Sequence, residues 1–381
     1  MKKEKIEVMA KRTCFNIKDS GINYVLSLIV PFVASLALIV VLMFLAMASG
    51  NNFREFVQTE FVEVVNLLFT PTVFFFIYFI YCKKTHVQVF KASEINFKLN
   101  WIKVLAVVLI GVTSVFLISP MISLIDYGFS CLGYNPANDL PYVMDNAWRL
   151  IIGIVSMAIL PAICEELLFR GLIFKGLQEK FNPHVAIVLS AAMFTLLHGS
   201  LQQTVYQFIL GMLLGYAMHY GKSIVYPMLL HFVNNLVVVI NSFIYTIKGL
   251  DVNVDPVYTT AWDYIGPFVW FVLAAAIIVG TIFILRYIDG KTKAANTEQG
   301  LTSDSPSKTS AEVFESEKPA KKGKKEVKNE EIIEPEVSII EEEVNTETKT
   351  LTHQDKMYVW GSMALAAFLW LTNTIMQFFG I

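Results

Sequence analysis

The chain has 381 residues, of which 55% are hydrophobic and only 16% charged, and its mean hydropathy is +0.55. Soluble globular domains are usually about 45–50% apolar and about 25% charged, so this composition excludes an ordinary soluble protein. The formal net charge of −2 excludes a nucleic-acid-binding protein that relies on a strongly basic surface. Four cysteines without a CxxC pair exclude a disulfide scaffold and a cysteine-based zinc module. The composition therefore predicts a polytopic membrane protein.

Nine apolar stretches approach or exceed the length of about 20 mostly apolar residues that a membrane-spanning helix needs. They are 22–48, 64–82, 101–125, 148–169, 184–198, 201–219, 224–247, 264–287 and 357–380. The four stretches between 148 and 247 are separated by only a few residues, so we expect them to form one helical bundle. The predicted fold is all-α, with about eight transmembrane helices in a bundle and one further C-terminal helix.

These stretches divide the chain into five parts: N-terminal transmembrane helices (1–147), a core of four helices (148–247), an eighth helix (248–287), a charged linker (288–356) and a final helix (357–381). The linker contains 11 Lys and 16 Asp and Glu, a net charge of −5, which leaves +3 for the rest of the chain. Such a segment cannot bury enough apolar surface to offset the entropy of ordering it, so we predict that it is disordered. A solvated tether is favoured over a specific binding segment.

The distribution of basic residues predicts the orientation in the membrane. Outside the linker, 16 of 19 Lys and Arg fall on one side of the membrane if the N-terminus is cytoplasmic. Only Arg54, Arg149 and Lys248 fall on the other side. Because cytoplasmic loops carry an excess of Lys and Arg, this asymmetry predicts a cytoplasmic N-terminus.

Polar residues interrupt three helices of the core. Of the four core stretches, the first carries Glu165, Glu166 and Arg170, the second ends at His198, and the fourth carries His231 and Asn235. Ionisable groups inside a span are costly and usually functional. Glu166 and Arg170 are four residues apart, so they share a helix face and can pair. His231 and Asn235 also share a face, whereas Glu165 is turned about 100° from Glu166. Since all of them fall at a similar depth, they predict one site.

The residue types at this site favour the activation of water. A carboxylate can take a proton from water as a general base, and a neighbouring histidine can share that proton. A second histidine and an asparagine amide supply donors for the oxyanion of a tetrahedral intermediate. Together these groups are typical of peptide-bond hydrolysis. Pro161, one turn before Glu165, predicts a helix kink that either opens space beside the glutamates or serves packing alone.

Three motifs occur in order on the core helices: Glu-Glu-x-x-x-Arg at 165–170, Phe-x-x-x-His at 194–198 and His-x-x-x-Asn at 231–235. They resemble the CPBP (CAAX protease and bacteriocin-processing, Abi-like) family of intramembrane glutamic proteases, which includes the type II CAAX prenyl endopeptidases. The resemblance covers roughly residues 148–247. The implied catalytic residues are Glu165, His198, His231 and Asn235, and the implied supporting residues are Glu166, Arg170 and Phe194.

The resemblance implies that Glu165 is the catalytic base and that His198 helps it to position water, while His231 and Asn235 form the oxyanion hole. Members of this family have also been described as metalloproteases, but the sequence contains no HExxH motif, the common helical zinc arrangement. We therefore expect no cofactor. Zinc bound by His198, His231 and a glutamate is the alternative, and it would leave Asn235 without a clear role.

The expected function is that of an intramembrane endopeptidase of the bacterial plasma membrane. Its partners would be the lipid bilayer and a membrane-embedded or lipid-modified peptide, including a prenylated CAAX-type peptide, and no nucleic acid. Two alternatives stay open: a non-catalytic membrane scaffold or bacteriocin-immunity protein, and a proton-coupled transporter, since buried ionisable residues also form proton relays. A transporter would predict inverted repeats, and none is evident in the sequence.

Overall fold

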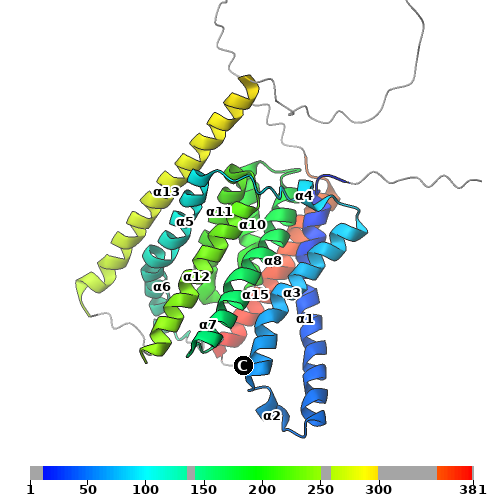
Figure 1. The fold of residues 1–381 in the computed structure, drawn as a ribbon, viewed down its shortest axis with the longest axis vertical. Coiled ribbons are helices and arrows are strands. Elements are labelled where there is room, and N and C mark those ends of the chain that lie inside the picture. The colour runs from blue at the N-terminus through cyan, green and yellow to red at the C-terminus, as the bar shows by residue number, and fades with distance from the viewer. Residues whose placement is uncertain (1–11, 135–141, 250–258, 299–349, 380–381) are drawn as a thin grey trace, which may run out of the picture. The chain divides into compact units, whose positions relative to one another are not determined.

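The computed structural model describes residues 12–134, 142–249, 259–298 and 350–379, and they form helices joined by short connections (Figure 1). The main helices are α1 (Ile17–Ala48), α3 (Glu60–Lys84), α5 (Trp101–Thr113), α6 (Ser119–Cys131), α7 (Ala147–Gly153), α8 (Leu160–Leu168), α9 (Phe174–Leu177), α10 (Pro183–Leu197), α11 (Leu201–Gly221), α12 (Val225–Ile247), α13 (Ala261–Glu298) and α15 (Ser362–Phe379). Shorter pieces are α2 (Phe53–Phe56), α4 (Val89–Ala92), α14 (His353–Lys356) and the π-helical segments η1 (Ser114–Ile118), η2 (Ile154–Ile159), η3 (Phe169–Ile173) and η4 (Met357–Gly361). No strand occurs within these ranges, and the predicted all-α fold is confirmed.

Seven helical runs in the described part of the chain are long and apolar enough to cross a membrane. They are Ile17–Ala48, Glu60–Lys84, Trp101–Cys131, Ala147–Leu177, Val225–Ile247, Ala261–Ala295 and His353–Phe378. The shorter helix α10 is also apolar, and α11 follows it in the sequence. Within the described residues, each of the nine predicted apolar stretches lies on a helix, so the chain is an integral multi-pass membrane protein.

Several element boundaries differ from those read from the sequence. The fourth stretch does not end at Phe169 but continues through η3 and α9 to Leu177, because its last apolar side chains are buried in the bundle. Residues 288–298, at the start of the predicted linker, continue α13, and His353–Lys356 at its end form α14. A capping box between Thr352 and Asp355 begins that short helix. Residues 299–349 lie outside the described residues, so the disorder predicted for them stays a prediction.

Two compact units divide the chain: residues 1–290 with 348–381, and residues 291–347. The first unit contains the helical bundle. Of the second, only the last turns of α13 fall among the described residues.

Close helix packing brings α10 and α11 together. A Cβ atom added to Gly211 would lie 3.0 Å from the Cα and Cβ atoms of Ala191, and one added to Gly215 would lie 2.9 Å from Ile187 Cγ2. The spacing of these two glycines predicts such an approach, because small residues let helix backbones come close. The contact fixes α11 against the helix that ends at His198.

The largest hydrophobic cluster surrounds α8 and η3. Its fully buried members include Phe169, Leu172 and Phe174 of the η3–α9 region, with Tyr24 from α1 and Tyr78 from α3. Burial of large side chains of this kind stabilises a fold by about 1.5–3 kcal/mol each. The helix that carries the two glutamates is therefore held rigidly by its neighbours.

Candidate active site

Glu165 and Glu166 lie on α8 between two π-helical segments, η2 before it and η3 after it. Such segments are rare and often occur at functional sites. Pro161 has no N–H, so it cannot donate to the carbonyl of Met157 four residues earlier. That carbonyl accepts a hydrogen bond of 3.0 Å from Nδ2 of Asn235 on α12. Pro161 therefore does more than kink the helix, because it leaves a carbonyl that holds one of the predicted site residues.

A buried ion pair braces the site from within the bundle. Arg170 Nη1 donates to Glu166 Oε1 at 2.9 Å, and both side chains are fully buried. Arg170 Nη2 donates to the Gly211 carbonyl of α11 at 3.0 Å, and its guanidinium lies 4.7 Å from the centre of the Phe194 ring. We call Glu166, Arg170 and the Gly211 carbonyl the brace. The brace contains the Glu166–Arg170 pair that the four-residue spacing predicts, and its bond to Gly211 joins the glutamate-bearing helix to α11.

His231 connects the brace to Glu165. Its Nδ1 lies 2.9 Å from Glu166 Oε1, and its Nε2 lies 4.0 Å from Glu165 Oε2. Because an ionised carboxylate only accepts hydrogen bonds, Nδ1 carries a hydrogen in this contact. The bond fixes the ring so that the other nitrogen faces Glu165. The exposed fraction of the side chain is 14% for Glu165 and 0% for Glu166, so the two neighbouring acids have different environments.

His198 caps the C-terminus of α10. Its Nδ1 lies 2.8 Å from the Phe194 carbonyl, and because a carbonyl only accepts, this nitrogen donates and leaves Nε2 as the acceptor of a neutral ring. The next residue, Gly199, has a φ of +62°, a left-handed conformation that glycine adopts without strain. The Phe194 ring packs edge-on against both His198 and His231, at centroid distances of 4.7 and 6.1 Å. Phe194 therefore contacts both imidazoles.

A second hydrogen-bonded group on α12 supports Asn235. Asn234 Nδ2 donates to Asn235 Oδ1 at 3.2 Å, and Asn234 Oδ1 accepts bonds from Tyr206 at 2.5 Å and from Ser114 at 3.0 Å. The sequence analysis missed Asn234, Tyr206 and Ser114. The only signal for them was the second asparagine beside Asn235.

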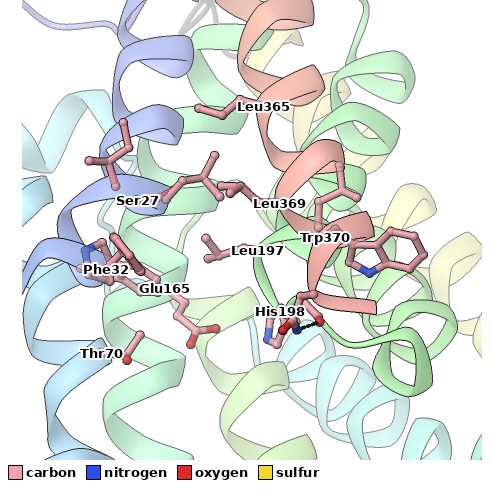
Figure 2. Close-up of a pocket in the computed structure, with 16 residues that line it drawn as sticks. Ser27, Phe32, Thr70, Glu165, Leu197, His198, Leu365, Leu369 and Trp370 are labelled. Atoms are coloured by element: carbon pink, nitrogen blue, oxygen red, sulfur yellow. Dashed lines mark hydrogen bonds between the residues drawn. The ribbon is translucent and has the colours of Figure 1, made fainter. Parts of the chain in front are cut away.

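A cavity of about 640 Å³ opens beside Glu165 and His198. In Figure 2 the Glu165 carboxylate points toward His198 across this space. Residues of α1, α3, α8, α10 and α15 line the cavity. The N-terminal helices α1 and α3 and the C-terminal helix α15 therefore both contribute to the walls around Glu165 and His198. His231 and Asn235 are not among the lining residues, but Nε2 of His231 lies 4.0 Å from Oε2 of the lining residue Glu165.

A zinc site does not fit the side chains as they lie. Zinc in enzymes usually takes three protein ligands, and no three His, Cys, Asp or Glu side chains gather suitably in the described ranges. The alternative set of His198, His231 and a glutamate is therefore not assembled.

The predicted site residues all converge on α8. Glu165 and His198 face the cavity, Glu166 and Arg170 form the brace, and Phe194 packs against both histidines. His231 and Asn235 contact α8 from α12, through Glu166 and the Met157 carbonyl. What the sequence did not predict is the lining of the cavity by α1, α3 and α15.

Comparison with known proteins gives a match for the part of the chain that carries these residues. Residues 147–237 match the family model described as type II CAAX prenyl endopeptidase Rce1-like. No curated protein and no solved structure matches the chain significantly. The matched residues span α7 to the middle of α12 and include all three motifs, so the resemblance predicted from those motifs is confirmed. Residues 147–237 of this chain are therefore similar to the Rce1-like family of type II CAAX prenyl endopeptidases.

Proposed function

We propose that the chain is an intramembrane endopeptidase in which Glu165 and His198 activate water against a peptide bond of a membrane-associated or lipid-modified peptide. The observation that carries the proposal is that these two side chains face each other across one cavity, next to a buried brace. The match of residues 147–237 to the Rce1-like family model supports the class of reaction.

In the proposed reaction, Glu165 takes a proton from water while the water oxygen bonds to the carbonyl carbon of the substrate. The electron pair of the C=O bond moves to its oxygen. Glu165 then returns the proton to the amide nitrogen, the oxyanion pair re-forms the C=O bond, and the C–N bond breaks with its electron pair going to nitrogen, which releases a carboxylic acid and an amine. His198 accepts a hydrogen bond from the same water at Nε2, because its Nδ1 is held by the Phe194 carbonyl.

We assign the stabilisation of the oxyanion to His231 and Asn235. Asn235 uses one amide hydrogen for the Met157 carbonyl and has a second one to donate. The Nδ1 hydrogen of His231 is bonded to Glu166, so the ring can also donate through Nε2 only as the imidazolium. The negative charge of Glu166 offsets the positive charge of that ring. Donors aimed at the developing charge are usually the largest contribution to such catalysis.

The proposal includes no cofactor, and its setting is a bacterial plasma membrane with the N-terminus in the cytoplasm. Its partners are the bilayer and the peptide substrate, which a prenylated CAAX-type peptide would exemplify. The excess of Lys and Arg on one side of the predicted spans supports the orientation.

The test uses the purified protein in lipid vesicles with a panel of membrane peptides, both unmodified and prenylated. Cleavage by the wild type is compared with that by Glu165→Gln and His198→Ala. Glu55→Gln is the matched control, because Glu55 is exposed on α2, outside the cavity. A chelator is added to the wild type in a parallel assay.

We expect the wild type and the control to cleave at least one peptide, and both site variants to lose cleavage. Loss of activity with the chelator would favour the zinc alternative. Cleavage that survives both site substitutions would overturn the mechanism, and biological function retained without any cleavage would favour a scaffold or immunity protein.

A further inference from the structure

The C-terminal helix α15 forms one wall of the cavity, although it lies outside the family segment 147–237. Leu365, Leu369, Trp370 and Asn373 of this helix line the cavity, together with residues of α1, α3, α8 and α10. Figure 2 shows Glu165 and His198 at one end of the space, with Leu365 and Leu369 farther along it. From Leu365 to Asn373 the helix rises about 12 Å. A group that entered the cavity would therefore lie along α15.

Two hydrogen bonds tie α15 to the residue after His198 and to the first turn of α11. Nε1 of Trp370 donates to Thr204 Oγ1 of α11 at 3.1 Å, and Nδ2 of Asn373 donates to the carbonyl of Gly199. Gly199 directly follows His198. These bonds fix the position of α15 relative to His198, in addition to its apolar contacts.

The lining of the cavity indicates what it accepts. Glu165 and His198 are its only ionisable lining side chains among the described residues, and both lie at one end. No Lys or Arg lines it there, so a negatively charged group would find no partner. A volume of this size and an apolar lining suit a neutral, chain-like apolar group.

We propose that Leu365 and Leu369 of α15 determine which substrates the protein accepts, by limiting the length and bulk of a neutral apolar chain that lies between α15 and α1. This inference rests on the proposed function for the position of the peptide bond at Glu165. The binding of the apolar chain itself does not depend on catalysis. Leu365 and Leu369 are specificity-determining residues in this proposal, and Trp370 and Asn373 hold their helix in place.

The experiment measures binding in the Glu165→Gln background, so that it does not require cleavage. The probes are three fluorescent membrane peptides of one sequence that carry an S-butyl, an S-decyl or an S-hexadecyl cysteine. Leu369→Trp fills the cavity and Leu369→Ala enlarges it. Leu371→Trp is the matched control, because Leu371 is the same residue type on the same helix, is 51% exposed and does not line the cavity.

We expect Leu369→Trp to weaken binding of the longest-chain peptide by about tenfold or more and to leave the butyl peptide almost unchanged, since pocket size discriminates apolar groups by roughly 10–200-fold. Leu369→Ala should favour the longest chain, and Leu371→Trp should bind all three peptides like the parent protein. Melting temperatures of the variants are measured in parallel, and Leu365→Trp replaces Leu369→Trp if the latter does not fold.

The same chain-length series is then assayed for cleavage with Glu165 intact. A chain-length preference that is the same in Leu369→Trp, Leu365→Trp and Leu371→Trp would overturn the assignment of α15, even if the protein cleaves peptides. A preference that shifts as expected in the binding assay would support it, even if no peptide is cleaved and the proposed function fails.

Discussion

Glu165 and Glu166 are adjacent, identical in chemistry and yet differ in almost every contact. Glu166 is fully buried and its carboxylate accepts bonds from Arg170 and His231, whereas the Glu165 carboxylate faces a cavity and has no hydrogen bond to a side chain of the described residues. The difference follows from helix geometry, because successive residues point about 100° apart. The face of α8 that carries Glu166 packs against Arg170 and His231, and the face that carries Glu165 borders the cavity. The same residue type therefore serves structure on one face and, in our proposal, chemistry on the other.

The comparison predicts that the brace determines stability. Arg170→Met should lower the free energy of unfolding by about 3–5 kcal/mol, because it leaves the buried Glu166 carboxylate without its cation. The free energy is measured by denaturant unfolding in mild detergent.

Arg149→Met is the control, since Arg149 pairs with Glu60 at 3.2 Å in a solvent-exposed setting. Exposed pairs of this kind contribute only about 0–1 kcal/mol. An equal loss of stability in both variants would mean that the brace is no more important than a surface pair.

Asn235→Ala should reduce kcat by about 10²–10³-fold, the usual cost of removing one oxyanion donor. KM should change little, because the donor acts mainly on the charge that develops in the transition state. Steady-state kinetics on a cleaved peptide separates the two parameters. An increase in KM with an unchanged kcat would instead assign Asn235 to substrate binding.

Pro161→Ala should have the smallest effect. The restored N–H of residue 161 competes for the Met157 carbonyl and weakens the bond that holds Asn235, a loss of about 1 kcal/mol or roughly fivefold in kcat. The melting temperature should not fall, because a helix interior favours alanine over proline.

The matched control for this variant is Pro267→Ala, which removes a proline from the interior of α13, outside the site. It should leave kcat at the wild-type value. If the two variants have the same kcat, Pro161 serves packing alone.

The sequence predicted the parts of this site that depend on spacing within one helix. The pairing of Glu166 with Arg170 and the different direction of Glu165 follow from helical periodicity. His198 and His231 were predicted as polar residues within apolar helices, and the structure adds that the Phe194 ring packs against both.

Contacts between distant segments were not predictable in this way. Nothing in the apolar stretch 357–380 indicates that it encloses a cavity with residues of α1, and the hydrogen bond from Asn373 to Gly199 joins positions far apart in the sequence. Pro161 indicates from the sequence that the Met157 carbonyl lacks its usual helical donor, but it does not indicate that Asn235 donates to that carbonyl instead. Which side chain replaces that partner depends on the packing of α12.

The central claim is that Glu165 acts on the reaction and not on the fold or on substrate binding. Single-turnover cleavage of one membrane peptide by the wild type and by Glu165→Gln, with the Kd of the peptide measured for both, tests it most directly. We predict an unchanged Kd and melting temperature and a cleavage rate reduced by about 10²–10⁴-fold, the usual contribution of a general base. A Glu165→Gln variant that cleaves the bound peptide at the wild-type rate would contradict the account.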